Sequence, residues 1–360
     1  MSPALRCPAC GATYDGGPAE PWRCSCGHAL DFAADPRPAG EPPAFGGLDT
    51  RRGLWAFADF LPMKRRVTLG EGFTPLVEAP GWDATFKLES LLPSGSFKDR
   101  GATTMLSRAA ALGVDRVVED SSGNAGAAIA QYAARAGIEA EIFVPADVKS
   151  SKLRAIEAAG ARAVRVEGDR DAVADACVER VEAGEGWYAS HAWNPAFFAG
   201  TATVAFEICA QRDWQAPDAV VCPLGHGTLL LGAYRGFRTL REAGWIDRVP
   251  RLLAAQAAGC APFVTALHGP EAAAGENGLA DGIQIRTPAR RDQVVEALAA
   301  TEGDAIAVEG PAVATALEEL HRGGFYVEPT SAAAPAALRA YRASGKIDPD
   351  ADVVVPLTGS

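Results

Sequence analysis

The sequence predicts an α/β fold built from parallel sheets that carry helices on both faces. Short apolar segments typical of buried strands alternate with helices of about ten residues along most of the chain. The 360 residues, 48% of them hydrophobic, suffice for two domains or for one large α/β unit with a crevice. Several expected strands run into turns rich in glycine or serine just before a helix begins.

Composition excludes several classes of partner. The formal net charge of −11 argues against binding to nucleic acid or to an anionic membrane. No hydrophobic run approaches the roughly 18 residues of a membrane span. The first seven residues lack the apolar core of a secretory signal, so we expect a cytoplasmic protein.

The expected elements follow the apolar periodicity in chain order. Helices are expected at residues 101–112, 125–136, 151–159, 172–182, 203–211, 229–242, 311–321 and 332–343. Strands are expected at residues 116–119, 139–144, 163–166, 187–189, 219–223, 252–256, 325–328 and 352–357. Residues 257–305 have no clear periodicity, and we assign them to a substrate-side segment.

Half of the eight cysteines crowd the N-terminal segment. They form Cys-Pro-Ala-Cys-Gly and Cys-Ser-Cys-Gly-His, with thirteen residues between Cys10 and Cys24. This pattern predicts a structural zinc site, whose ligands are Cys7, Cys10, Cys24 and Cys26. Free thiols, a redox pair, or His28 in place of one thiolate are the alternatives. Residues 1–40 carry three arginines, no lysine and four carboxylates, which favours a structural or lid-like module over a nucleic-acid binder.

A proline-rich stretch separates the cysteine segment from the rest of the chain. Residues 35–43 contain four prolines and cannot form regular helix or strand. We therefore expect a zinc-ribbon-like segment at 1–35, a linker at 36–47 and a catalytic domain at 48–360.

Lys98 is the first candidate for a catalytic side chain. It stands in Ser-Gly-Ser-Phe-Lys-Asp-Arg-Gly, residues 94–101, after small loop-forming residues and at the start of an expected helix. A helix N-terminus carries partial positive charge and disfavours an ammonium group, which suits a lysine that forms a Schiff base. A solvated surface lysine is the ordinary alternative.

Three further segments place a loop after an expected strand. Residues 120–127, Asp-Ser-Ser-Gly-Asn-Ala-Gly-Ala, suit an anion or form an ordinary capped turn. Residues 222–230, Cys-Pro-Leu-Gly-His-Gly-Thr-Leu-Leu, suit a phosphate, although a lone Gly-x-Gly is weak evidence. Residues 357–359, Leu-Thr-Gly, follow the last strand, and the carboxyl ends of parallel strands line ligand crevices.

Together these segments resemble the fold-type II pyridoxal-phosphate (PLP) enzymes. Gly-Glu-Gly-Phe-Thr-Pro-Leu at 70–76 and Glu-Pro-Thr-Ser-Ala at 328–332 are similar to further motifs of that family. Within the family the chain is most similar to the threonine synthases and their close paralogues. The implied fold is tryptophan synthase β-like: two three-layer subdomains with parallel sheets and the cofactor crevice between them. The smaller subdomain, about residues 100–200, would be inserted in the larger one.

The resemblance implies a role for each site residue. Lys98 would hold PLP as an internal aldimine and move the proton at the substrate α-carbon. Asn124 would bond the phenolic oxygen of the cofactor, and Thr358 would meet its pyridine nitrogen. The remaining cofactor contacts would come from Phe97, Gly225, His226, Gly227 and Thr228. The substrate carboxylate would bind to Ser121, Ser122 and Ala125.

One stretch departs from the threonine synthase pattern. These enzymes bind the phosphate of O-phosphohomoserine, and their pattern has an arginine shortly after an Asn-Pro. In residues 191–198 of this chain, Phe197 stands in place of the arginine and Ala192 in place of a hydroxyl residue. No lysine or arginine occurs at 181–211. A distant cation could come from Lys149, Lys152 or Arg154.

Three functions remain open at this stage. The first is the threonine synthase reaction of amino-acid biosynthesis, which converts O-phosphohomoserine and water to threonine and phosphate. The second is β- or γ-elimination or replacement by a paralogous PLP enzyme on a less phosphate-like amino acid. The third is a non-catalytic zinc-ribbon interaction protein. A homodimer is expected by family analogy alone.

Overall fold

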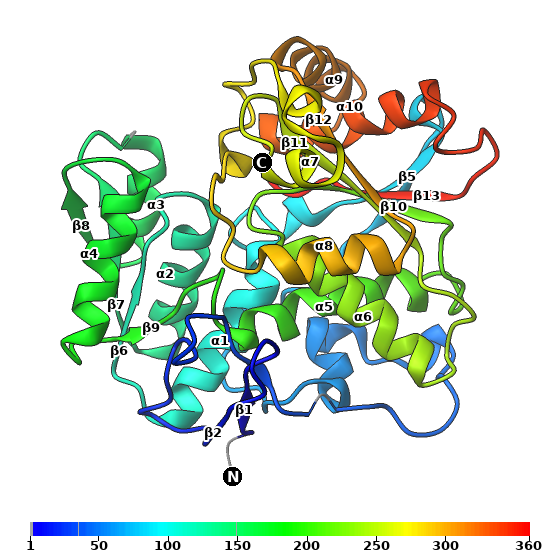
Figure 1. Ribbon diagram of the computed structural model, residues 1–360. Coiled ribbons are helices and arrows are strands. Elements are labelled where there is room, and N and C mark those ends of the chain that lie inside the picture. The colour runs from blue at the N-terminus through cyan, green and yellow to red at the C-terminus, as the bar shows by residue number, and fades with distance from the viewer. Residues whose placement is uncertain (1–2, 35, 149) are drawn as a thin grey trace. The chain divides into compact units, whose positions relative to one another are not determined.

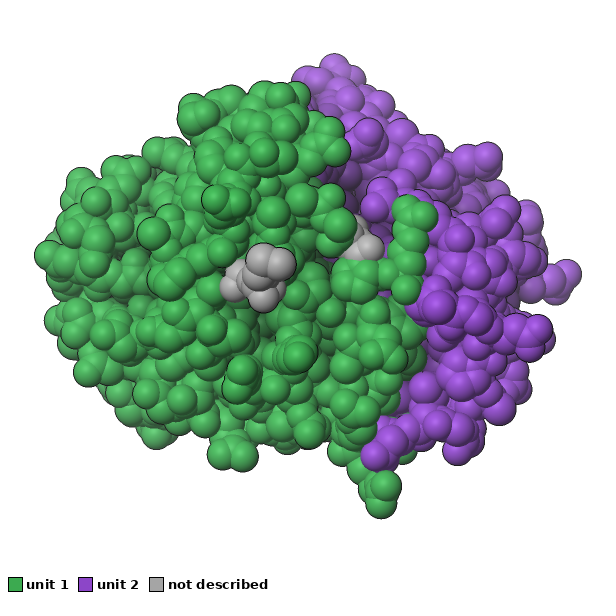
Figure 2. All heavy atoms as spheres, turned by 90° about the horizontal axis from the view of Figure 1, so that it is seen from below, with its two compact units in different colours: residues 1–37, 50–72, 98–201 green, residues 38–49, 73–97, 202–360 purple. Residues whose placement is uncertain are grey.

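The computed structural model describes residues 3–34, 36–148 and 150–360, and the chain divides into two compact units (Figure 2). Unit 1 comprises residues 1–37, 50–72 and 98–201, and unit 2 comprises residues 38–49, 73–97 and 202–360. Each unit contains its own sheet with helices around it, so the expected α/β class is confirmed.

The main sheet of unit 1 is parallel and has the strand order β8–β7–β6–β9. Its strands are β6 (Arg116–Glu119), β7 (Glu139–Pro145), β8 (Arg162–Val166) and β9 (Trp187–Tyr188). Val117, Val118 and Ile142 are completely buried, as expected where helices cover both faces of a parallel sheet.

Helices surround this sheet on two sides (Figure 1). As the chain moves outward from β6 to β8, α2 (Asn124–Ala136) and α3 (Ser150–Ala158) cover one face, with α1 (Lys98–Leu112) packed on α2. The chain then returns to β9 through α4 (Arg170–Glu182), which right-handed crossover connections place on the opposite face. The direction of the strand order therefore reverses between β6 and β9. Ligands of such sheets bind at the carboxyl ends of the strands beside the reversal.

The N-terminal segment of unit 1 forms a small antiparallel sheet in the order β2–β1–β3. Its strands are β1 (Leu5–Arg6), β2 (Thr13–Tyr14) and β3 (Asp31–Phe32). Unit 1 also contains η2 (Thr50–Phe60). Helix α5 (Pro195–Ala210) begins in unit 1 and ends in unit 2.

The sheet of unit 2 has the order β12–β11–β10–β13–β5–β4 and is parallel except for the edge strand β4. The strands are β4 (Leu76–Ala79), β5 (Ala84–Lys87), β10 (Ala219–Pro223), β11 (Arg251–Ala257), β12 (Asp304–Val308) and β13 (Val353–Pro356). Here the strand order reverses between β10 and β13, so the loops that follow these two strands lie at the place where a ligand is expected.

Helices also pack on the sheet of unit 2. The α-helices of this unit are α6 (Thr228–Glu242), α7 (Pro262–His268), α8 (Arg291–Ala300), α9 (Gly310–Arg322) and α10 (Pro329–Ala343). Short 3₁₀ turns occur at η1 (Phe45–Gly47), η3 (Pro80–Trp82), η4 (Glu89–Leu91), η5 (Pro270–Ala273) and η6 (Asp281–Ile283). Helix α10 packs along β10 to β13 and supplies a large share of the core through small buried alanines.

One expected strand and one expected helix need correction. The strand expected at 325–328 is wrong, because these residues carry no strand in the structure: Tyr326 is 78% exposed and Glu328 is the N-cap of α10. The helix expected at 203–211 begins earlier, at Pro195, since proline is favoured in a first helical turn. The stretch 257–305 contains α7, α8 and the start of β12.

None of the helices in the described ranges is long and apolar enough to cross a membrane.

Candidate active site and cysteine cluster

Lys98 is the first residue of α1, as the sequence predicts. The segment before it is held by the C-terminus within unit 2: Phe97 donates its N–H to the Thr358 carbonyl at 3.0 Å, and Ser360 donates to Gly95 at 3.0 Å. Ser96 and Gly359 form an antiparallel bridge in the same place. The chain therefore fixes the peptide leading into Lys98 against the loop that carries Thr358.

The loop at residues 121–124 joins the carboxyl end of β6 to α2. The Gly123 N-cap makes no side-chain hydrogen bond to the helix, so the first N–H groups of α2 are not capped in that way. Ser121 is buried and accepts a hydrogen bond from Gly123 N–H at 3.3 Å. A Cβ on Gly126 would lie 1.8 Å from the Ser121 carbonyl, which explains the glycine. This arrangement suits a carboxylate or phenolate.

The glycine-rich loop of unit 2 joins the carboxyl end of β10 to α6. Gly227 is the N-cap of α6, has φ +83°, and provides no side-chain cap. A Cβ on Gly227 would lie 2.5 Å from Val294 Cγ2, and one on Gly225 would lie 3.1 Å from Ile283 Cα. The neighbouring chain therefore requires both glycines. A fifteen-residue helix with such an N-terminus fits the phosphate of a cofactor.

Thr358 follows β13 and belongs to a buried hydroxyl pair with Ser331. Their oxygen atoms are 3.1 Å apart, and Ser331 Oγ also accepts from Gly359 N–H at 2.7 Å. Ser331 donates its single proton to the Gly359 carbonyl at 2.8 Å, which leaves Thr358 to donate to Ser331. An uncharged hydroxyl therefore stands at this strand end. It fits a pyridine ring nitrogen when Thr358 turns its proton from Ser331 to the nitrogen lone pair.

These loops have the chemistry that PLP requires: a lysine, two helix N-termini for anionic groups and a neutral hydroxyl. Residues 67–359 match the family described as "Pyridoxal-phosphate dependent enzyme".

The chain belongs to this family.

Relatives narrow its place in the family. A threonine synthase of Methanocaldococcus jannaschii is 32% identical, with 98% of this chain and 91% of the relative covered. A threonine synthase of Methanosarcina acetivorans is 35% identical over 85% of this chain and 79% of the relative. The chain is therefore a PLP-dependent, threonine synthase-like lyase.

Solved structures agree with the fold of the family. An L-serine ammonia-lyase from Rhizomucor miehei is 25% identical with a TM-score of 0.68, over 80% of this chain and 93% of that chain. Threonine deaminase isoform 2 from Solanum lycopersicum, 20% identical, has a TM-score of 0.69 over 90% of this chain and 87% of that chain. The second similarity bears on the fold alone.

The residues that depart from the threonine synthase pattern are buried in unit 1. Phe197 has no exposed surface and packs on α1, because a Cβ on Gly101 would lie 2.4 Å from its ring. Thr104 of α1 donates a hydrogen bond to the Ala196 carbonyl at 2.8 Å, which fixes the two helices further. Ala192 is 5% exposed. Of the proposed distant cations, Lys149 and the side chain of Lys152 lie outside the described residues.

Sequence reasoning missed one buried pair beside the loop at residues 121–124. Glu119 ends β6 with no exposed surface, and its Oε1 is 2.6 Å from Nδ1 of His191, which follows β9. Burial raises the pKa of Glu119 well above its usual value, and the charge of neighbouring Asp120 raises it further. The only available signal was the pair of carboxylates at the end of an apolar strand, just before Ser121.

A second buried network holds the glycine motif at 70–76. In unit 1, Glu71 is completely buried and accepts from Trp55 Nε1 at 3.1 Å and from Tyr132 Oη at 2.8 Å. In unit 2, Lys87 donates to the Thr74 carbonyl at 2.6 Å and to Glu207 at 2.9 Å. The paired groups satisfy one another, so this motif is rigidly positioned.

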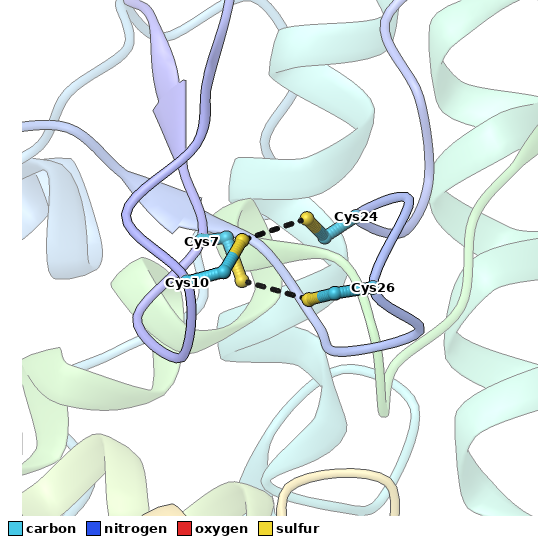
Figure 3. Close-up of side chains that lie close together, drawn as sticks. All are labelled: Cys7, Cys10, Cys24 and Cys26. Carbon is cyan, nitrogen blue, oxygen red and sulfur yellow. Dashed lines mark hydrogen bonds between the residues drawn. The ribbon is translucent and has the colours of Figure 1, made fainter.

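The four N-terminal cysteines point toward a common centre (Figure 3). All four Sγ atoms lie within 4.8 Å of one another, with 3.6 Å between Cys7 and Cys26 and 3.5 Å between Cys10 and Cys24. Four sulfur atoms at Zn–S distances of 2.3 Å in a tetrahedron are about 3.8 Å apart, so the donor set fits zinc.

The turns between these cysteines and a local hydrogen bond also suit a metal. Gly11 and Gly27, with φ of +77° and +89°, close the two turns by donating to the carbonyls of Cys7 and Cys24. A backbone hydrogen bond at Cys26, followed by one from the Tyr14 hydroxyl, lowers the pKa of Cys24 to about 6, whereas the contact with Cys24 raises the pKa of Cys10 and Cys26. A thiolate is the form that binds a metal.

Proposed function

We propose that this chain catalyses elimination or replacement at the side chain of a small amino acid, with Lys98 bonded to PLP. Bound PLP supplies an electron sink for the bond broken at the substrate α-carbon. Lys98 then moves the proton at that carbon. The observation that carries the proposal is the position of Lys98: it begins α1, and the residue before it is bonded to Thr358.

The remaining site residues bind and orient. We assign the cofactor phosphate to the N–H groups at the start of α6, supplied by Gly225, His226, Gly227 and Thr228. Asn124 donates to the phenolic oxygen, Thr358 contacts the ring nitrogen, and Phe97 lines the cofactor site. The substrate carboxylate accepts hydrogen bonds from Ser121, Ser122 and Ala125. The uncapped start of α2 supports this last assignment.

The first candidate reaction is that of threonine synthase, in which O-phosphohomoserine and water give threonine and phosphate. The similarity to threonine synthases over nearly the whole chain supports it. The test is to record the cofactor absorbance of purified protein, add O-phosphohomoserine, and assay released phosphate and threonine. A band shift with both products supports this reaction, whereas a band that ignores the compound argues against it.

Lys98→Ala is the matching variant for the cofactor. We expect the visible band and the activity to disappear, because the bond between lysine and cofactor is lost. A persistent band in this variant would contradict the assignment. If the wild-type protein shows no cofactor band after addition of PLP, the result would favour the third function, a non-catalytic interaction protein.

The second candidate is a paralogous elimination or replacement on a less phosphate-like amino acid. The observation that favours it is Phe197, which is buried against Gly101 where the threonine synthase pattern has an arginine. A buried aromatic ring provides neither charge nor donors for a phosphate.

We also propose that the cysteine cluster binds one structural zinc ion. The short distances between its sulfur atoms support this assignment. Metal analysis should find about one equivalent of zinc, and Cys7→Ser should lose it. Folded, metal-free wild-type protein would refute the proposal.

The broader expectations also stay proposals. We propose a ribbon-like segment at 1–35, a linker at 36–47 and a catalytic domain at 48–360. We further propose a cytoplasmic homodimer that binds neither nucleic acid nor membranes, in line with the net charge of −11.

A further inference from the structure

The pair formed by Glu119 and His191 lies where a ligand of unit 1 is expected. Glu119 is the last residue of β6 and His191 follows β9, and the strand order of the sheet reverses between these two strands. The loop at residues 121–124, which we propose binds the substrate carboxylate, begins two residues after Glu119. Both side chains are therefore at the carboxyl edge of the sheet, beside Ser121 and Ser122.

The contact between the two side chains fixes the imidazole. The 2.6 Å distance joins Oε1 of Glu119 to Nδ1 of His191, and both groups are at least nine-tenths buried. A carboxyl group on Nδ1 orients the ring, so that a proton exchanged with a substrate would pass through Nε2. The second carboxylate oxygen, Oε2 of Glu119, is buried and has no hydrogen-bond partner within the described part of the chain. Buried polar atoms in proteins normally have hydrogen-bond partners, so packing alone does not explain this unsatisfied oxygen.

The side chains beside His191 do not favour a phosphate. Glu119 and Asp120 are adjacent carboxyl groups, and Asp120 is held by the Tyr188 hydroxyl at 2.9 Å. Phe197, whose ring centroid is 6.0 Å from that of His191, supplies an apolar surface beside the imidazole. The segment 181–211 contains no lysine or arginine. Burial raises the pKa of both carboxyl groups, and the ring of Phe197 offers no donors, so this edge suits an uncharged oxygen or sulfur substituent better than a dianion.

We propose that His191, oriented by Glu119, protonates the leaving group of an amino-acid substrate whose side chain carries a neutral oxygen or sulfur substituent. This inference rests on the proposed function. In the step, the electron pair of the α C–H bond forms a carbon–carbon double bond, while the bond between the side-chain carbon and the leaving atom breaks and the leaving atom keeps that bond's electron pair. The proton on His191 Nε2 moves to that atom, which departs as a neutral alcohol, water or thiol. His191 is left neutral and regains a proton from water.

The test compares two substrates that differ in their need for an acid. Hydroxide is a poor leaving group and L-serine needs protonation, whereas chloride leaves β-chloro-L-alanine without a proton. His191→Asn should lower kcat/KM for L-serine by about 10²–10⁴-fold, the usual contribution of a general acid. The loss for β-chloro-L-alanine should be much smaller, so the ratio of the two values should change by at least about 10²-fold. Pyruvate formation measures both reactions.

Glu119→Gln tests the positioning role. It should reduce L-serine turnover less than His191→Asn does, because glutamine still accepts a hydrogen bond from Nδ1. Its effect should be confined to L-serine, with kcat/KM for β-chloro-L-alanine close to that of wild type, because only the acid step depends on the orientation of His191. Unchanged thermal midpoints and cofactor spectra in both variants would exclude loss of folding. If His191→Asn does not fold, His191→Leu replaces it, and the same change in the ratio of kcat/KM for L-serine to kcat/KM for β-chloro-L-alanine is expected.

The outcomes separate the two proposals. An equal loss on both substrates would overturn the role of His191, as would wild-type protein that turns over O-phosphohomoserine but neither of the other two. Wild-type protein that binds PLP and acts on none of the three compounds would instead count against the proposed function.

Discussion

The ion pair between Glu20 and Arg108 gives a quantitative test of how the cysteine segment stabilises the rest of unit 1. Arg108 of α1 donates through Nε to Glu20 Oε1 at 2.9 Å, and a second contact joins its Nη2 to Oε2. The two side chains are only 2% and 5% exposed, and the guanidinium lies 5.0 Å from the ring centroid of Phe32. Removing one partner of a buried pair leaves an uncompensated charge.

Glu20→Ala should therefore lower the free energy of unfolding by about 3–5 kcal/mol. For a unit of this size that corresponds to a fall in thermal midpoint of roughly 6–20 °C. The assay is thermal unfolding followed by circular dichroism in the zinc-loaded protein. The matched control is Glu182→Ala, which removes the partner of Arg23 in another pair between the cysteine segment and the rest of unit 1.

The control pair is 46% and 55% exposed and spans 3.2 Å, so its loss should change stability by less than about 1 kcal/mol. Equal effects of Glu20→Ala and Glu182→Ala would refute the reasoning from burial. So would Glu20→Ala with a wild-type thermal midpoint.

The remaining predictions concern the metal, the pocket and the core. Chelation of zinc should lower the thermal midpoint, measured by calorimetry, of the wild-type protein but not of Cys7→Ser. An equal shift in both proteins would contradict the proposed zinc site. Phe197→Arg should lower the midpoint, because a charge replaces a ring on Gly101, and should raise phosphate release from O-phosphohomoserine per folded molecule; no change in release would argue against exclusion by the ring. Lys87→Met should destabilise unit 2 by about 3–5 kcal/mol, whereas Lys87→Met with Glu207→Leu should recover most of this loss in chemical denaturation.

The sequence predicted the elements in which local pattern and tertiary structure agree. The strand at 116–119 is recognised by its short apolar run. The helix that begins at Lys98 is recognised because small, loop-forming residues precede it. Strand β12 was missed because Asp304–Val308 is short and lies in an irregular stretch. The segment at 325–328 has the apolar composition of a strand but finds no neighbouring strand in the described chain.

The candidate site divides in the same way. Lys98, Ser121 and the glycines before α6 are found by their motifs, because each motif encodes its own local turn. The pairing of Glu119 with His191 joins residues 72 positions apart, so that no local pattern could reveal it. The same holds for the contact of Gly101 with Phe197, which depends on how α5 packs on α1.

The central claim is that Lys98 carries the cofactor. The most direct measurement is to load the purified protein with PLP, reduce it with borohydride, and locate the pyridoxyl group by mass spectrometry of peptides. We predict one labelled peptide containing residues 94–101, with the label on Lys98. A label on another lysine, or an unlabelled protein after loading, would contradict the account.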